Sequence, residues 1–190
     1  MKSIIVNIRS FMFLFIASQF ISTTDVFSQK FSNEQGFGGA VFNWSQLAKG
    51  SSVEAGGLGA KFLTKQFYLG GAGYGIESRK NGNEYDLGYG GILGGYVFNP
   101  NQKIHFNMAM LVGFGGITER LETGTKNNDF LTIVKPTAEV DFKIAKWFKI
   151  GARVGYRKVW GSDEVTVGNS NLSSFTSGIA LKFGNFYSSN

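Results

Sequence analysis

Apolar and polar side chains alternate along most of the chain, and residues 146–160, KWFKIGARVGYRKVW, show the pattern clearly. At a period of two, one face is apolar and the other carries cations and glycines: Phe148, Ile150, Ala152, Val154 and Tyr156 against Lys149, Gly151, Arg153, Gly155 and Arg157. A helix could also group the cations, but the interior glycines and the β-branched and aromatic neighbours favour a strand. Its apolar face must meet either a protein core or lipid.

Eight alternating segments follow one another, at about 36–47, 52–63, 67–79, 85–98, 104–119, 129–144, 148–160 and 173–184. They exceed the five or six residues usual for soluble strands, and a tilted strand needs about 9–11 residues to cross a bilayer. Short connections at 64–66, 99–103 and 145–147 alternate with longer polar ones at 80–84, 121–129 and 161–172. An up-and-down antiparallel order would place all the short turns at one end, as in outer-membrane barrels.

The first 28 residues have the order of parts of a secretory signal peptide. Lys2 and Arg9 precede the apolar run Phe11–Ile16, and Val26–Ser28 provide a small-residue cleavage site. Cleavage there leaves residues 29–190 as one domain. The chain has no cysteine, which excludes disulfides, thiolate chemistry and a lipid-anchored N-terminal cysteine.

Neither the net charge nor the candidate catalytic and binding residues indicate a specific chemistry. The net charge is +6, but an exported chain is not expected to bind nucleic acid, so the basicity needs another explanation. His105 is the only histidine, which excludes a multi-histidine metal site. The glycine-rich runs 70–75 and 88–95 match no nucleotide-binding motif, so no cofactor is expected. His105 could serve a lipid-modifying hydrolase, but its place beside a short turn favours a hydrogen bonder at the mouth of the lumen.

Aromatic residues gather toward the two ends of the predicted strands. Interface belts are expected from Trp44, Phe62, Phe106, Phe142, Trp147, Phe148, Trp160 and Phe183, with Tyr68, Tyr74 and Tyr85 at similar levels. Amphipathic rings at both ends are typical of proteins that meet two bilayer interfaces. Strands are also rich in aromatic residues for other reasons, and the clustering at the short-turn end favours the interface interpretation.

These features, with the final strand FTSGIALKF at 175–183, resemble the small eight-stranded outer-membrane β-barrel family, of the OmpA transmembrane domain and OmpX type. The resemblance covers about residues 36–184. It implies an all-β, eight-stranded antiparallel up-and-down transmembrane barrel in the outer membrane of a Gram-negative bacterium. It also implies a monomer whose partners are outer-membrane lipid and the barrel-assembly machinery, which reads a C-terminal aromatic; Phe183 or the Phe186–Tyr187 pair could serve.

If the apolar face meets lipid, the charged side chains point into the lumen. The proposed lumen network comprises Lys61, Glu77, Asp86, Lys135, Glu139, Asp141, Lys149, Arg153 and Arg157. An eight-stranded barrel is only wide enough to be filled by its own side chains, so opposite charges there should pair. Antiparallel pairing through 145–147 places Glu139 opposite Arg153 and Asp141 nearest position 151. The glycine-rich strands between 36 and 98 leave the inner and outer faces ambiguous.

The sequence is compatible with three functions. The favoured one is a closed, non-enzymatic outer-membrane barrel with a structural role or a surface partner bound through loops 121–129 and 161–172. The second is a small transport barrel or a lipid-modifying barrel enzyme. The third is a soluble secreted barrel of lipocalin type, with its apolar side chains inside.

Overall fold

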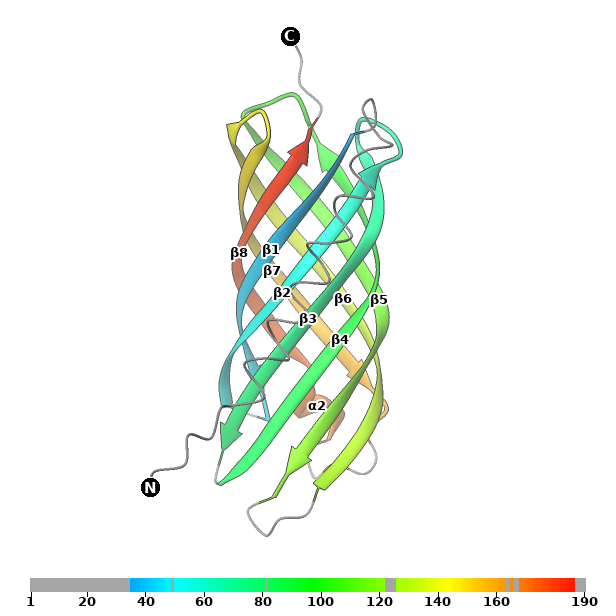
Figure 1. The fold of residues 1–190 in the computed structure, drawn as a ribbon, viewed down its shortest axis with the longest axis vertical. Coiled ribbons are helices and arrows are strands. Elements are labelled where there is room, and N and C mark those ends of the chain that lie inside the picture. The colour runs from blue at the N-terminus through cyan, green and yellow to red at the C-terminus, as the bar shows by residue number, and fades with distance from the viewer. Residues whose placement is uncertain are drawn as a thin grey trace, which may run out of the picture. The chain divides into compact units, whose positions relative to one another are not determined.

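A closed antiparallel barrel of eight strands makes up the described part of the chain (Figure 1). The computed structural model describes residues 35–48, 50–80, 82–121, 126–162, 165 and 168–186. The strands are β1 (Gly36–Leu47), β2 (Gly50–Phe62), β3 (Phe67–Lys80), β4 (Asn83–Phe98), β5 (Ile104–Arg120), β6 (Lys126–Ala145), β7 (Phe148–Trp160) and β8 (Ser174–Asn185), with one helical turn, α2 (Asn169–Leu172), before β8. The expected signal peptide, Tyr187 and parts of loops 121–129 and 161–172 lie outside the described residues.

Each strand pairs with its neighbour in sequence, and β1 pairs with β8 from Gly36↔Asn185 to Trp44↔Ser177 to close the barrel. The predicted fold class is confirmed, and the predicted segments match the strands to within three residues at each end. The register predicted for β6 and β7 is also confirmed, with Glu139 opposite Arg153 and Asp141 opposite Gly151.

The outer wall carries large apolar side chains. On β5 the exposed large apolar residues are Ile104, Phe106, Met108, Met110, Val112 and Phe114, and β7 and β8 continue the apolar surface with Val154, Phe175, Ile179 and Phe183. The inner wall of these strands carries the charged residues. This arrangement is the reverse of a soluble barrel, where apolar side chains fill the interior. No helix among the described residues is long and apolar enough to span a bilayer.

Inward-facing glycines allow neighbouring strands to pack side by side in a narrow barrel. Gly113 on β5 lies opposite Gly91 on β4. A Cβ atom at Gly113 would lie 2.6 Å from the Gly91 Cα, which is backbone and cannot rotate away. Gly59, on the outer face of β2, has no atom within 4 Å of its ideal Cβ position. The inner glycine is therefore required by packing, and the outer one is not.

We expect Gly113→Ala to lower the free energy of unfolding by about 1–3 kcal/mol, because the added methyl overpacks a rigid wall. The matched control Gly59→Ala adds the same methyl on the outside and should change stability by less than about 0.5 kcal/mol. Urea unfolding of the refolded barrel in detergent measures both. Equal effects would mean that the inner and outer faces of these strands are wrongly assigned.

Candidate functional site

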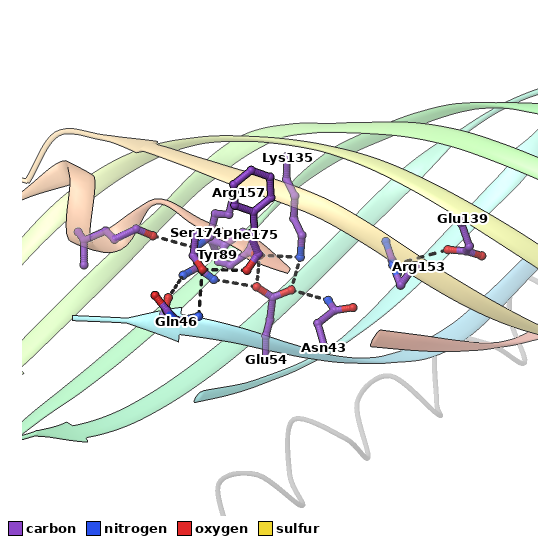
Figure 2. A network of polar contacts seen from close by, with 11 residues as sticks. Asn43, Gln46, Glu54, Tyr89, Lys135, Glu139, Arg153, Arg157, Ser174 and Phe175 are labelled. Atoms are coloured by element: carbon purple, nitrogen blue, oxygen red, sulfur yellow. Dashed lines mark hydrogen bonds and ion pairs between the residues drawn. The ribbon is translucent and has the colours of Figure 1, made fainter. Parts of the chain in front are cut away.

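The lumen contains an ionic cluster centred on Glu54 of β2, here called the Glu54 network. Arg157 Nη1 and Tyr89 OH donate to Glu54 Oε2 at 2.8 and 2.7 Å, and Asn43 Nδ2 donates to Oε1 at 2.6 Å. Lys135 Nζ pairs with Glu54 Oε1 and lies 3.1 Å from Tyr89 OH. Figure 2 shows Glu54 with these four partners gathered around it. One buried carboxylate therefore holds two buried cations.

Two cations against one anion leave the Glu54 network with an excess positive charge. Aromatic rings lie against that charge, since Lys135 Nζ is 4.1 Å from the centroid of the Tyr74 ring. A ring face attracts a cation, and the attraction is stronger where water is excluded. Tyr74 and Tyr89 also pack on each other, with centroids 5.2 Å apart. The tyrosines thus complete the shell around Lys135.

A second cluster lies toward the short-turn end and is here called the Asp141 network. Lys182 Nζ donates to both oxygens of Asp141 at 3.0 Å and also pairs with Glu139. His105 Nε2 lies 3.5 Å from Asp141 Oδ2 and 3.1 Å from Lys149 Nζ. All five side chains are buried. His105, the single histidine of the chain, therefore lies within contact distance of charged residues inside the lumen.

Arg153 lies next to Glu139, as expected from the strand register. Its Nε is 3.6 Å from Glu139 Oε2, and Figure 2 shows the two side chains facing each other further along the barrel. Its Nη1 is buried without a hydrogen-bond partner among the described residues. The pair is desolvated, and its guanidinium is incompletely satisfied by hydrogen bonds.

At the loop end, α2 lies in contact with the barrel mouth. Arg157 Nε donates to Leu172 O at 3.0 Å and its Nη2 to Gln46 O at 2.8 Å, while Ala48 N donates to Asn171 O at 3.1 Å. Leu172 of α2 joins a buried apolar layer at this end of the lumen, which also comprises Leu47, Ile76, Leu87, Ile117, Leu131, Ile133 and Val159. Arg157 therefore connects the Glu54 network to the element that covers this mouth.

The short-turn end is filled by aromatic side chains instead. Phe37 packs against Phe62, Tyr68 and Phe186, with ring centroids 5.5, 5.2 and 5.8 Å apart. Tyr68 OH donates to Asn107 Oδ1 at 3.0 Å, which satisfies the one polar atom of this cluster. Side chains therefore occupy the lumen at both ends as well as in the two ionic networks between them.

Six of the proposed lumen residues lie inside the barrel: Lys135, Glu139, Asp141, Lys149, Arg153 and Arg157. Lys135 and Arg157 belong to the Glu54 network, the other three apart from Arg153 belong to the Asp141 network, and Arg153 lies beside Glu139. Glu54, Asn43 and Tyr89 were not proposed, although Glu54 is the centre of the larger network. The one sequence feature that could have found Glu54 is its alternation with Val53, which is exposed on the outer wall.

The proposal was wrong for Lys61, Glu77 and Asp86, which lie on the outer wall. Lys61 and Glu77 are exposed, and Asp86 is partly exposed. Glu77 and Asp86 face each other on β3 and β4 near the loop end, where Arg120 Nη1 lies 2.7 Å from Asp86 Oδ2. Their neighbours Ile76 and Leu87 are buried inside the barrel, so the alternation of each strand turns Glu77 and Asp86 outward.

The expected interface aromatics divide in a similar way. The outer wall carries Trp44, Phe106, Phe142, Trp147, Phe148, Trp160 and Phe183, exposed or partly exposed. Phe62 was wrongly assigned, because its ring is buried inside the barrel against Phe37. Tyr68, Tyr74 and Tyr85 are also inside. These inward rings fill space in the lumen that glycine-rich strands leave empty.

The described residues contain no group of three or more histidine, aspartate or glutamate side chains arranged to hold a metal ion. The carboxylates of Glu54, Glu139 and Asp141 instead face ammonium and guanidinium groups, which occupy the positions that a cation would need. The chemistry that the lumen residues support is charge pairing.

The barrel is similar to two solved outer-membrane barrels. Neisserial surface protein A matches with a TM-score of 0.63 and 12% identity, over 80% of this chain and 97% of that one. The N-terminal β-barrel domain of Pseudomonas aeruginosa OprF matches with a TM-score of 0.55 and 14% identity, over 80% of this chain and 99% of that one. This chain has the fold of the small eight-stranded outer-membrane barrels. At these identities the likeness concerns the fold alone.

No protein-family model matches the chain, and no curated protein sequence matches it significantly. The residues of the two ionic networks must be interpreted from their own geometry.

Proposed function

We propose that the chain is an integral outer-membrane protein whose lumen is filled by its own side chains. It acts without catalysis, as a structural element of the membrane or by presenting its loops to a surface partner. The observation that carries the proposal is the inverted distribution of polarity: large apolar side chains stand outside, and buried ion pairs lie inside.

The outer wall supports insertion into lipid. Val112, Phe114, Val154 and Phe175 are each more than half exposed, and the apolar surface continues around the barrel. Soluble monomers rarely expose large contiguous apolar patches. A lipid-embedded strand must also satisfy its backbone groups within a closed ladder, and the pairing of β1 with β8 supplies that closure. A soluble lipocalin-type barrel would place these side chains inside.

The filled lumen supports a non-transporting role. An open polar pore needs a continuous water-accessible path, whereas this lumen holds an apolar layer, two ionic networks and an aromatic cluster in succession. Arg157 contacts both the Glu54 network and α2, so opening the loop end would break a desolvated ion pair or its bonds to Leu172 and Gln46. This coupling favours a closed barrel over the transport alternative.

Two further elements of the proposal concern assembly and partners. Phe183 is exposed on β8 and stacks on Phe148, whereas Phe186 is buried in the lumen, so of these two described aromatics Phe183 is the one accessible to the assembly machinery. The similar barrel Neisserial surface protein A is named as a surface protein. By analogy, loops 121–129 and 161–172 are the segments through which this chain would meet a partner outside the cell.

Membrane fractionation followed by planar-bilayer recording tests the proposal. We expect the expressed chain to pellet with outer membranes, to migrate differently on gels before and after heating, and to give little steady conductance as pure folded protein. The heat-dependent migration reflects the closed hydrogen-bond ladder, and the low conductance reflects the filled lumen. The control is the same protein unfolded and diluted without detergent, which should not insert.

Each alternative has its own outcome in this experiment. Recovery of the folded chain in the soluble periplasmic or secreted fraction would contradict membrane insertion and support a soluble barrel. Stable, ion-selective channels from membrane-extracted protein would leave the membrane barrel standing but replace the closed lumen with a transport role. Hydrolysis of outer-leaflet lipid by the purified protein would support the enzyme alternative.

A further inference from the structure

All three short turns carry an exposed lysine. Lys65 lies in the β2–β3 turn, Lys103 in the β4–β5 turn and Lys146 in the β6–β7 turn. The described residues at this end, 61–67, 98–106 and 143–148, include no aspartate or glutamate. Lys65, Lys103 and Lys146 are here called the lysine rim.

The charges at the other end are mixed. On the outer wall near the loops, Arg79 pairs with Glu84, and Arg120 lies 2.7 Å from Asp86. Cations there have acidic neighbours within the barrel itself. Among the described residues, the outer surface at the short-turn end is therefore more basic than the outer surface near the loops.

Backbone hydrogen bonds fix the lysine rim in position. Each turn bonds to a neighbouring strand: Gln66 O accepts from Val97 N at 2.8 Å, Lys103 O from Lys143 N at 2.8 Å, and Trp147 O from Gly184 N at 3.0 Å. Thr64 Oγ1 also accepts from Phe67 N at 2.9 Å within the first turn. The three lysines thus stand on one laterally bonded ring of backbone rather than on free loops.

Each rim lysine has a large exposed apolar neighbour within two residues. Leu63 is 64% exposed beside Lys65, Ile104 is 52% exposed beside Lys103, and Trp147 is 61% exposed beside Lys146. A lysine combined with an exposed apolar or aromatic side chain suits the boundary between acyl chains and headgroups, because the stem stays in the apolar region and the ammonium reaches the polar one. An acidic water-soluble polymer would leave these apolar side chains in water.

We infer that the lysine rim binds the phosphate groups of anionic phospholipids in the leaflet at the short-turn end, and that it holds the barrel at a fixed depth. The inference rests on the proposed function, since it requires insertion into a bilayer. A strand rises about 3.3 Å per residue, so a lysine one or two residues beyond the aromatic belt lies at the level of the phosphates. Three separate turns give three separate contacts around the barrel.

The position of the tryptophans allows a direct measurement. The full chain has three tryptophans, and Trp147 is the one next to the rim, whereas Trp44 and Trp160 stand toward the loop end. A chain with Trp44→Phe and Trp160→Phe therefore reports lipid contacts at the rim. It is folded into phosphatidylcholine vesicles that contain a minor fraction of a brominated lipid. This lipid is phosphatidylglycerol in one sample and phosphatidylcholine in the other, and in both the bromine atoms lie near the headgroup.

At low salt we expect brominated phosphatidylglycerol to quench Trp147 with an association constant about fivefold higher than brominated phosphatidylcholine, because a lysine near an anionic surface gains attraction. The preference should disappear in the variant Lys65→Gln/Lys103→Gln/Lys146→Gln. It should also disappear in about 1 M salt, where the Debye length falls to about 3 Å. The matched control Arg79→Gln/Arg120→Gln/Lys158→Gln makes the same change in charge near the loop end and should retain the preference.

Failure of the rim and failure of the membrane barrel give different results. If the two brominated lipids quench Trp147 equally in the protein that keeps all three rim lysines, the inference is wrong but membrane insertion still holds. A preference that survives the three rim substitutions would also overturn it. Quenching by neither lipid would contradict insertion itself. If soluble peptidoglycan fragments bind the rim and anionic lipid does not, the partner is an acidic polymer and the lipid assignment is wrong.

Discussion

Glu54→Gln is expected to lower the free energy of unfolding by about 3–5 kcal/mol, because it removes the carboxylate that pairs with both Lys135 and Arg157. Lys135 and Arg157 are both almost completely buried beside Glu54. The substitution preserves the volume of the side chain, so the loss reports charge rather than a cavity. Equilibrium unfolding in urea, followed by tryptophan fluorescence in detergent, measures it.

A second substitution should recover part of this loss. Without the Glu54 charge, Arg157 still donates to Leu172 O and Gln46 O, but Lys135 keeps only Tyr89 and the aromatic rings. We expect Glu54→Gln/Lys135→Met to be more stable than Glu54→Gln alone by about 1 kcal/mol or more, since contacting residues couple by about 0.5–3 kcal/mol.

The matched control for this cycle is Glu77→Gln, which makes the same chemical change at an exposed position on the outer wall of β3. It should alter stability by no more than about 0.5 kcal/mol. The double variant could instead lose the sum of the stabilities that Glu54→Gln and Lys135→Met lose singly. In that case the two side chains are not coupled, and the Glu54 network does not stabilise the barrel as described.

The strands could be predicted from the sequence because the periodicity of two persists over each of them. It was most informative in β5–β8, where bulky apolar residues occupy one face and charges the other. In β7, Val154 is outside and Arg153 inside, as the alternation predicts. The register between β6 and β7 followed from the short turn alone, because a tight turn fixes which residues face each other.

Glu54 could not be placed with the same certainty. It is followed by Ala55, Gly56 and Gly57, which give no polarity contrast between the two faces of β2. Its partners are also distant in sequence: Tyr89 lies 35 residues away and Arg157 lies 103 away. Only closure of the barrel brings them together, and the local pattern contains no information about pairs across the lumen.

The errors at Lys61, Glu77, Asp86 and Phe62 have a common physical cause. The rule of apolar outside and polar inside holds where lipid surrounds the wall, and it lapses at the ends of the barrel, where the outside meets water and headgroups. Glu77 and Asp86 therefore face outward near the loops, and Phe62 faces inward at the short turns. Alternation gives the two faces of a strand, but the depth of a residue decides which face is polar.

That dependence on depth leads to the second large expected effect. Val154→Arg should lower the stability of the folded barrel by about 2–4 kcal/mol, because it places a cation against lipid near the bilayer midplane. Val154 is 59% exposed on the outer wall and lies in the middle of β7. Folding into vesicles and urea titration, with heat-modifiable migration as the readout, measure the change.

Val53→Arg is the matched control, because it exchanges the same residue types at a position that is also exposed, at 56%. Val53 lies near the loop end of β2, opposite Trp44 of the aromatic belt, where a cation can reach water. Its cost should be about 0–1 kcal/mol. A soluble barrel would tolerate arginine equally well at both positions, because both side chains would face water. Equal and small effects of the two substitutions would therefore contradict a lipid-facing outer wall, whereas a large loss at Val154 alone requires one.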